Sequence, residues 1–134
     1  MGKIKLAMMS ATSSMFLIGS AMAADLTGPQ LKELLVGKSV YLETTATTVV
    51  GAGRGVLYYA EDGAALYKTG SDRILHGKWS IKENTICIDW KEMRNNPCSR
   101  YDKRGDTITV FNVGTRRARG KVLKIADGNS EKIE

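Results

Sequence analysis

A series of short strand-like segments, separated by turn signals at close intervals, constrains the fold of this chain more than any other feature. Turn sequences such as EDG at 61–63 and GSD at 70–72 divide segments that are rich in β-branched and aromatic residues. The segments that we predict as strands are 39–48, 55–60, 64–69, 73–82, 85–91, 98–103, 107–113 and 120–126. Such spacing is typical of an antiparallel meander. We therefore predict a mainly β domain of about seven or eight strands, as either a small barrel or a strongly curved sheet.

One short helix is predicted before the first strand. Asp25 or Thr27 can cap its first turn with a side-chain oxygen, and Pro29 suits an early helical position, where its missing N–H is not needed. Gly37 ends the helix. Its apolar stripe consists of Leu31, Leu34 and Leu35. Because the stripe is narrow and has no aromatic anchor, we expect the helix to plug one end of the β-structure rather than to bind a partner or a membrane surface.

The first 23 residues have the three parts of a secretory signal peptide. Lys3 and Lys5 form a positive end, residues 6–20 are uncharged, and the AMA sequence at 21–23 suits a signal peptidase. A membrane anchor is the alternative, but this apolar run is interrupted by Ser and Thr and is shorter than the ~20 residues that span a bilayer. We predict cleavage after Ala23 and no transmembrane segment in the mature form. The domain boundaries that we predict are 1–23 for the signal, 24–126 for a single β-rich domain and 127–134 for a polar tail.

The two cysteines, Cys87 and Cys98, lie in neighbouring predicted strands joined by a turn at 95–97 (NNP). Such a hairpin brings two side chains within the range of a disulfide. A redox pair is more often a Cys-x-x-Cys motif, and a zinc site needs more ligands than these cysteines and His76, the only histidine. We therefore predict a structural disulfide. Together with the signal peptide, it indicates a periplasmic or secreted protein.

The charge of the mature chain is mildly positive. Loss of Lys3 and Lys5 with the signal lowers the formal net charge from +6 to about +4. This excess favours an anionic envelope polymer or an acidic envelope protein as a partner, and it gives no argument for nucleic acid. Ordinary solubility charge is the alternative interpretation.

Two groups of side chains are candidates for binding. Basic residues crowd the disulfide hairpin and the approach to the last strand, where Arg117, Arg119 and Lys121 project from one face if the segment is extended. The candidate partner-binding residues are Arg94, Arg100, Arg117 and Arg119. The candidate ligand-cavity residues are Tyr58, Tyr67, Trp79 and Trp90. Protection of edge strands by the arginines and core packing of the aromatic residues are the alternatives.

No catalytic residue, metal site or cofactor is predicted. The GAGRG sequence at 51–55 imitates a phosphate-binding glycine loop, but β-type sequence follows it instead of a helix. A histidine suits acid–base chemistry, yet no recognisable nucleophile accompanies His76 in the sequence. We therefore do not expect an enzyme.

The order of several weak motifs carries a resemblance to known proteins. An aromatic segment with a turn at 58–63, a GKW strand at 77–79 and a Cys87-x-x-Trp90 strand followed by Cys98 succeed one another. In this order they resemble the small secreted families of unknown function that are common in alphaproteobacteria. The Gly-x-Trp strand is also distantly similar to that of the lipocalin-like barrels. The resemblance implies an exported, β-barrel-like product and transfers neither an activity nor a catalytic residue.

Two classes of function follow. The preferred one is an exported binding or interaction protein that engages an anionic envelope component or an acidic protein, and inhibition of an envelope-directed hydrolase is one form of it. The alternative is a small-ligand carrier with a lipocalin-like cavity. A filled core beside an exposed basic hairpin would favour the first class, whereas a closed barrel with an unfilled cavity would favour the second.

Overall fold

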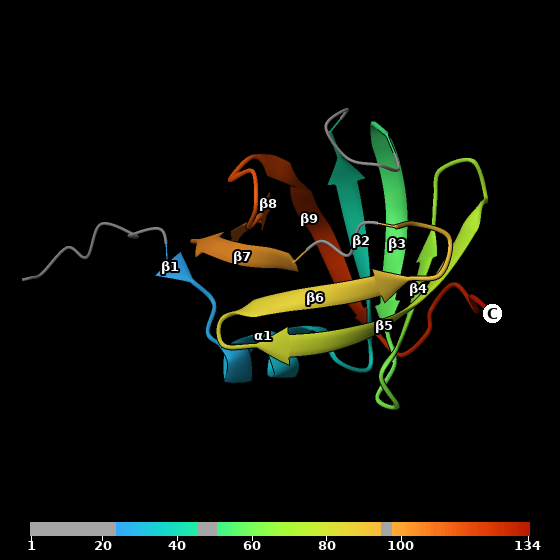
Figure 1. Cartoon of the computed structure of the whole chain (residues 1–134), viewed down its shortest axis with the longest axis horizontal. Coiled ribbons are helices and arrows are strands. Elements are labelled where there is room, and N and C mark those ends of the chain that lie inside the picture. Colours follow the sequence, from blue (N-terminus) through green and yellow to red (C-terminus); the bar gives the residue numbers. More distant parts are fainter. Residues whose placement is uncertain (1–23, 46–50, 95–97) are drawn as a thin grey trace, which may run out of the picture.

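The computed structural model describes residues 24–45, 51–94 and 98–134, and these residues form nine strands and one short helix (Figure 1). The helix α1 spans Gly28–Leu35. The strands are β1 (Ala24–Asp25), β2 (Lys38–Thr44), β3 (Gly53–Tyr59), β4 (Ala64–Lys68), β5 (Ile74–Lys82), β6 (Thr85–Trp90), β7 (Cys98–Arg104), β8 (Thr107–Asn112) and β9 (Ala118–Asp127). The predicted mainly β fold with one short helix is confirmed. The predicted signal peptide, the end of the first predicted strand at 46–48 and the predicted turn at 95–97 lie outside the described residues.

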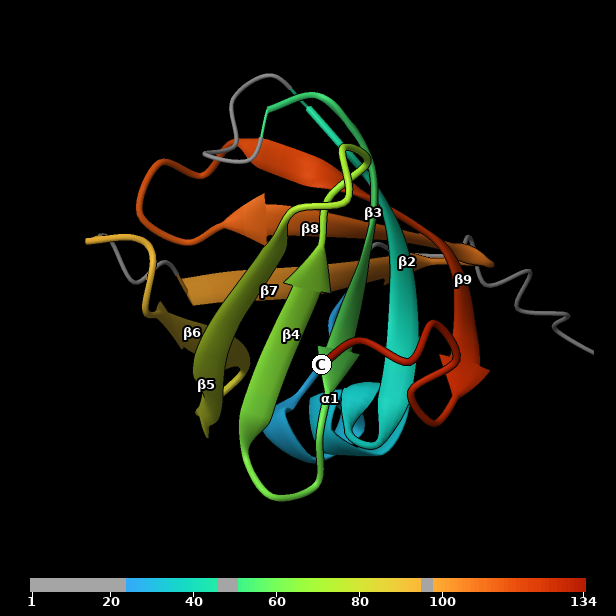
Figure 2. The same cartoon turned by 90° about the vertical axis from the view of Figure 1, so that its right-hand side faces the viewer.

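Eight of the strands close into an antiparallel barrel. Each strand from β2 to β8 pairs with the strand that follows it in the sequence, and β9 pairs with both β8 and β2 (Figure 2). Of the two arrangements that the sequence left open, the barrel is therefore the one observed. Closure pairs the edges that an open curved sheet would expose to other chains.

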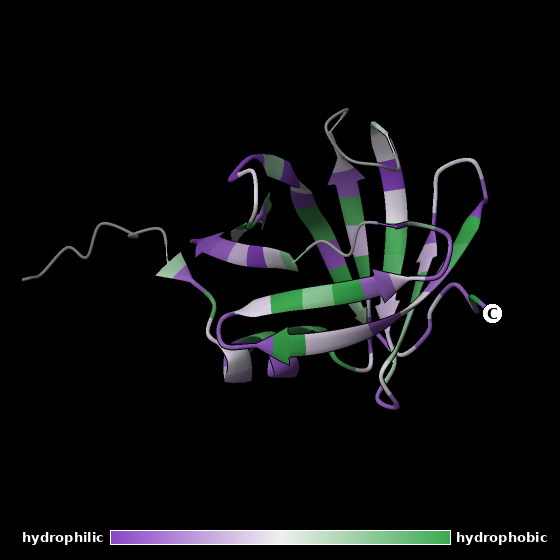
Figure 3. Ribbon diagram, viewed as in Figure 1, coloured by the Kyte–Doolittle hydropathy of each residue, from purple (hydrophilic) through white to green (hydrophobic). Residues whose placement is uncertain are grey.

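Side chains along the barrel strands alternate between the interior and the outside. In β6, Ile86, Ile88 and Trp90 belong to the buried core, and Cys87 and Asp89 alternate with them. Figure 3 shows how strongly hydrophobic residues populate β6 compared with the more hydrophilic β7. Other strands contribute to the same core with Val40, Leu57, Leu75, Ile108 and Val110.

The helix α1 closes the end of the barrel where β5 ends and β6 begins. The N–H of Gln30 donates to Thr27 Oγ1 (3.4 Å), and the N–H of Thr27 donates to Gln30 Oε1 (2.9 Å), so the two residues form a capping box. Leu31 and Leu35 are completely buried in the barrel core. The helix is thus held at its first turn and buries its apolar stripe, which is the plug that the sequence predicts.

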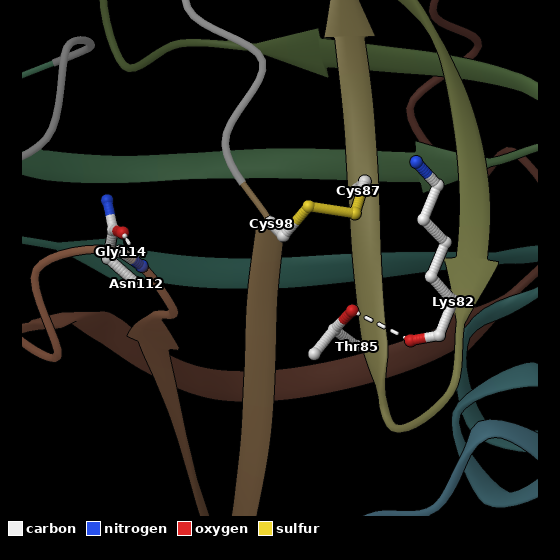
Figure 4. The surroundings of a disulfide bond; sticks show 6 residues. All are labelled: Lys82, Thr85, Cys87, Cys98, Asn112 and Gly114. Carbon is white, nitrogen blue, oxygen red and sulfur yellow. Dashed lines mark hydrogen bonds between the residues drawn. A yellow bond between two sulfur atoms is a disulfide. The ribbon is translucent and has the colours of Figure 1, made fainter.

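The junction between β6 and β7 has the shortest pairing among the described neighbours in the barrel. Only two residue pairs join these strands, Ile86 with Ser99 and Cys87 with Cys98. The second pair is a disulfide (Figure 4), and its Cα atoms lie 4.0 Å apart. The predicted disulfide is confirmed. Because Cys98 O also accepts a hydrogen bond from the N–H of Val113 (3.1 Å), the turn after β8 is held beside the same covalent link.

The strand β1 extends the barrel wall beyond the start of β6. It pairs Ala24 with Lys103 and Asp25 with Asp102, on the second half of β7, whereas β6 pairs with the first two residues of β7. The chain then enters α1 through Leu26, whose N–H donates to Tyr101 O (2.8 Å). A two-residue strand has no periodic pattern, and for this reason the sequence did not reveal it.

The C-terminal segment, residues 128–134, crosses the outside of the barrel in front of β2 and β3 (Figure 2). The hydroxyl of Ser39 donates to Gly128 O (2.7 Å) and accepts from the N–H of Ser130 (3.1 Å). The hydroxyl of Tyr41 lies 2.8 Å from Ser130 Oγ. Ile133 is only 3% exposed. The segment that we predict as a polar tail is thus hydrogen-bonded to β2 and contains one buried apolar side chain.

Candidate functional site

The interior of the barrel is not completely filled. A cavity of about 80 Å³, partly open to the outside, lies within it. The apolar part of its lining includes Leu57, Leu75, Ile86, Ile88, Trp90 and Val110. The polar part consists of Thr44, Tyr59, Tyr67, Ser99, Tyr101 and Arg119. The cavity therefore combines an apolar wall with hydroxyl groups and one guanidinium group.

Two of the predicted ligand-cavity residues, Tyr67 and Trp90, line this space together. Their rings meet edge to face, with centroids 6.4 Å apart and an angle of 62° between the planes. Gly55 on β3 leaves room for the Tyr67 ring, because a Cβ atom at this position would collide with the Tyr67 hydroxyl. Burial raises the pKa of Tyr67, so this side chain is neutral at physiological pH.

The other two predicted ligand-cavity residues, Tyr58 and Trp79, do not line the cavity. Tyr58 is partly buried and alternates on β3 with the buried Tyr59. Trp79 is partly buried near α1, and its Nε1–H donates to Ala60 O (2.8 Å). The sequence singles out all four aromatic residues as candidates. Whether each one lines the cavity depends on the end and the face of the barrel at which its strand places it.

Tyr59 and Tyr101 meet inside the barrel. They come from β3 and β7, which are four strands apart in the closed order and therefore lie on opposite walls. Their hydroxyl oxygens are 2.8 Å apart, and each residue is 1% exposed. Burial raises the pKa of Tyr59 well above its ordinary value and raises the pKa of Tyr101 to about 12. Both hydroxyl groups therefore keep their protons at physiological pH.

A β-bulge directs Arg119 into this polar region. In the pairing of β8 with β9, Val110 faces Gly120 and Phe111 faces Ala118, so that Arg119 is an additional residue on β9. A bulge of this kind breaks the alternation of side chains and re-aims the inserted one. The sequence predicts that Arg119 projects from the same face as Arg117 and Lys121. That prediction does not hold, because Arg119 lines the cavity.

The guanidinium group of Arg119 lies close to the two tyrosines in a partly desolvated position. Burial lowers the pKa of Arg119, and the nearby Tyr101 and Tyr59 act in the opposite direction. Its Nε is buried and has no hydrogen-bond partner in the described part of the chain. No Asp or Glu is among the described residues that line the cavity. A positive charge thus faces the interior without a carboxylate partner there.

The other predicted partner-binding arginines lie apart from the cavity lining. Arg94 and Arg117 are exposed. Arg100 is already engaged, because its Nη1 lies 2.7 Å from Asp25 Oδ1 and its guanidinium group lies 4.1 Å from the centroid of the Phe111 ring. The structure therefore gives the four arginines three different environments instead of placing them together in one cluster.

His76 lies on the outer side of β5, where it contacts two acidic or terminal groups. Its Nδ1 is 3.0 Å from Glu92 Oε1, and its Nε2 is 3.2 Å from the main-chain oxygen of Glu134. These contacts raise the pKa of His76, the hydrogen bond with Glu92 being the largest cause. The histidine thus links the segment after β6 to the C-terminus.

Sequence reasoning missed the residues that form the polar part of the cavity. Tyr59 shares a face with Leu57, two positions before it in a predicted strand, and this indicates an inward position but not a partner. Nothing in the sequence indicates that Tyr101 lies opposite Tyr59, because that neighbourhood depends on barrel closure. The inward direction of Arg119 depends on the bulge. Both arrangements can be derived only when the pairing register of the strands is known.

Comparison with known proteins assigns no family to this chain. Among the described residues, no helix is long and apolar enough to cross a membrane, and no group of three His, Cys, Asp or Glu side chains could hold a metal ion. Comparison of the chain with protein-family models, with curated proteins and with solved structures gives no match.

Proposed function

We propose that this protein is an exported small-ligand binding protein that holds its ligand inside the barrel. The observation that carries the proposal is the unfilled cavity of about 80 Å³ in the core. Protein interiors are normally packed as densely as organic crystals, and an unfilled space among core side chains is destabilising. A cavity with an apolar wall and a few convergent polar groups is the usual form of a small-molecule site.

The surface-binding alternative receives less support from the arrangement of charges. It requires Arg94, Arg100, Arg117 and Arg119 to face one acidic partner. Arg100 is paired with Asp25, and Arg119 lines the interior. The two arginines that remain exposed provide a smaller basic surface than the sequence suggests. A closed barrel with an interior cavity is the arrangement that favours a carrier.

Export is part of the same proposal. The disulfide between Cys87 and Cys98 is of the kind that persists in oxidising compartments, and it supports a location in the periplasm or outside the cell. The signal-like sequence at 1–23 supports the same location. A carrier in that compartment would bind a small molecule of the envelope or the medium.

The experiment that tests interior binding compares wild-type protein with a cavity-filling variant. Val110→Phe places a larger ring against the cavity, and Val113→Phe is the matched control because Val113 is 40% exposed. A set of small organic compounds is titrated while backbone amide NMR shifts are recorded. We expect at least one compound to shift signals of cavity residues in wild type and in Val113→Phe, but not in Val110→Phe. The absence of such shifts for every compound, or equal binding by Val110→Phe, would overturn the proposal.

A further inference from the structure

The side chain of Arg119, which lines the cavity, has a hydrogen-bond donor without a partner in the part of the chain that the structure describes. Its buried Nε has no hydrogen-bond partner, and none of the ion pairs found among the described residues includes it. Arg119 is partly buried, and a buried donor without an acceptor, such as its Nε, is unfavourable. The fold nevertheless aims this side chain inward through a bulge. The arrangement is explained if an anion completes the site.

The tyrosine pair provides a second donor beside that charge. Tyr59 and Tyr101 share one hydrogen bond, which uses one of their two phenolic protons. The remaining proton belongs to a neutral hydroxyl, because burial raises the pKa of both residues. An acceptor placed between Arg119 and the pair would therefore receive hydrogen bonds from a charged donor and from a hydroxyl.

The size and the apolar lining of the cavity limit the rest of the ligand. Since a cavity of about 150 Å³ holds one benzene molecule with its six carbon atoms, a cavity of about 80 Å³ holds about three or four non-hydrogen atoms, and the carboxylate is included in that number. Leu57, Leu75, Ile88 and Trp90 present apolar surface to those atoms. A single positive charge matches a single negative one, and the planar fork of a guanidinium group matches the two oxygens of a carboxylate.

We propose that the barrel binds short-chain monocarboxylates, with the carboxylate on Arg119 and the tyrosine pair and the hydrocarbon part against the apolar wall. This inference rests on the proposed function and specifies its ligand class. Phosphate is disfavoured because it carries more charge than the one guanidinium group in the lining balances. A long-chain fatty acid exceeds the volume of the cavity.

Isothermal titration calorimetry with sodium acetate, sodium octanoate and ethanol tests the proposal on three proteins. These are wild type, Arg119→Met and the matched control Arg117→Met, in which an exposed arginine two residues away is removed. We expect wild type and Arg117→Met to bind acetate equally and more tightly than ethanol or octanoate. Arg119→Met should weaken acetate binding about tenfold or more, because a hydrogen-bonded charge is lost, and should change ethanol binding less than about twofold.

The outcomes separate this inference from the proposed function. If neither acetate nor ethanol nor octanoate binds wild type, interior binding of ligands of this size fails, and the inference fails with it. If ethanol binds as well as acetate, or if Arg119→Met leaves acetate binding unchanged, the carboxylate assignment fails while interior binding stands. Tighter binding of octanoate than of acetate would overturn the short-chain limit.

Thermal unfolding of the ligand-free proteins provides a readout that does not depend on binding. Replacement of the partly buried Arg119 by an apolar side chain of similar length removes an unsatisfied buried donor and leaves the packing volume nearly unchanged. We therefore expect Arg119→Met to unfold at the same temperature as wild type or at a higher one, and acetate to raise the unfolding temperatures of wild type and Arg117→Met but not that of Arg119→Met. A marked loss of stability in Arg119→Met would show that the guanidinium group supports the fold, and it would overturn the assignment to a ligand.

Discussion

Tyr59 and Tyr101 join opposite walls of the barrel through a single hydrogen bond of 2.8 Å between two buried hydroxyl groups. Removal of either hydroxyl leaves the other without its partner in the core. We predict that Tyr59→Phe and Tyr101→Phe each lower the free energy of unfolding by about 1 kcal/mol, and that the double variant loses less than the sum of the two. Urea unfolding of the four proteins measures this coupling. Strictly additive losses would contradict the shared hydrogen bond.

The same pair predicts a loss of stability at alkaline pH. The pKa of Tyr101 is about 12 in the folded protein, and that of an unfolded tyrosine is about 10. The folded state therefore holds its proton more tightly, so the contribution to stability is complete below pH of about 10 and is lost as the pH rises beyond it. Titration of tyrosinate absorbance, together with urea unfolding across this range, measures the effect. A Tyr101→Phe variant should show a weaker dependence on pH, and an unchanged dependence would contradict the assignment.

The disulfide should contribute more to stability than the one other residue pair between β6 and β7, Ile86 with Ser99. Cys87 and Cys98 are 11 positions apart, and a closed loop of this size is worth about 3 kcal/mol in the loop-entropy model. We predict that the Cys87→Ala/Cys98→Ala variant loses about that much free energy of unfolding. Urea unfolding of the variant and of wild type, each with and without a reductant, tests this. The reductant should destabilise wild type and leave the variant unchanged, and a variant as stable as oxidised wild type would refute the prediction.

Gly28 should not tolerate even a methyl group. It is buried at the first turn of α1, and a Cβ atom there would collide with the main-chain oxygen of Glu83. Alanine favours a helix over glycine by about 1 kcal/mol, but overpacking costs about 1–3 kcal/mol. We therefore predict that Gly28→Ala is net destabilising in thermal unfolding. The exposed Glu33→Ala on the same helix is the control and should stay within about 0.5 kcal/mol of wild type. A stabilised Gly28→Ala would show that propensity outweighs the close contact.

His76 should titrate above its ordinary range. The hydrogen bond with Glu92 and then the contact with the main-chain oxygen of Glu134 raise its pKa, while Lys91 acts against the shift. The folded state therefore favours the protonated ring. Its contribution to stability is present below pH of about 6.5 and is lost as the pH rises through the raised pKa. NMR titration of the ring in wild type and in Glu92→Gln measures this. Glu92→Gln should return the pKa toward the ordinary value, and identical titrations would contradict the stated cause.

The strands could be predicted from the sequence because each one depends on local patterns. Alternation of Ile86, Ile88 and Trp90 indicated both the strand and its inward face, and the helix was marked by Thr27 and its leucine stripe. The disulfide followed from the hairpin. These features depend only on residues that are close together in the sequence, so residue types and spacing are sufficient to predict them.

The site could not be predicted in the same way, because it depends on closure and register. The contact of Tyr59 with Tyr101 spans 42 positions and arises only when β9 returns to β2. Trp79 and Trp90 share one strand pair, yet only Trp90 lines the cavity. The buried Ile133 likewise lies in a segment whose composition indicated only solvent exposure.

The bulge at Arg119 has a consequence for how relatives of this chain should be compared. The extra residue of β9 decides whether a guanidinium group meets solvent or the core, and the strand pairing resumes at Gly120. A homologue could keep the arginine and yet lose one residue between Asn112 and Gly120, which would turn that side chain outward. The length of this segment, and not the identity of the residue alone, would then distinguish barrels with a charged interior from barrels with a neutral one.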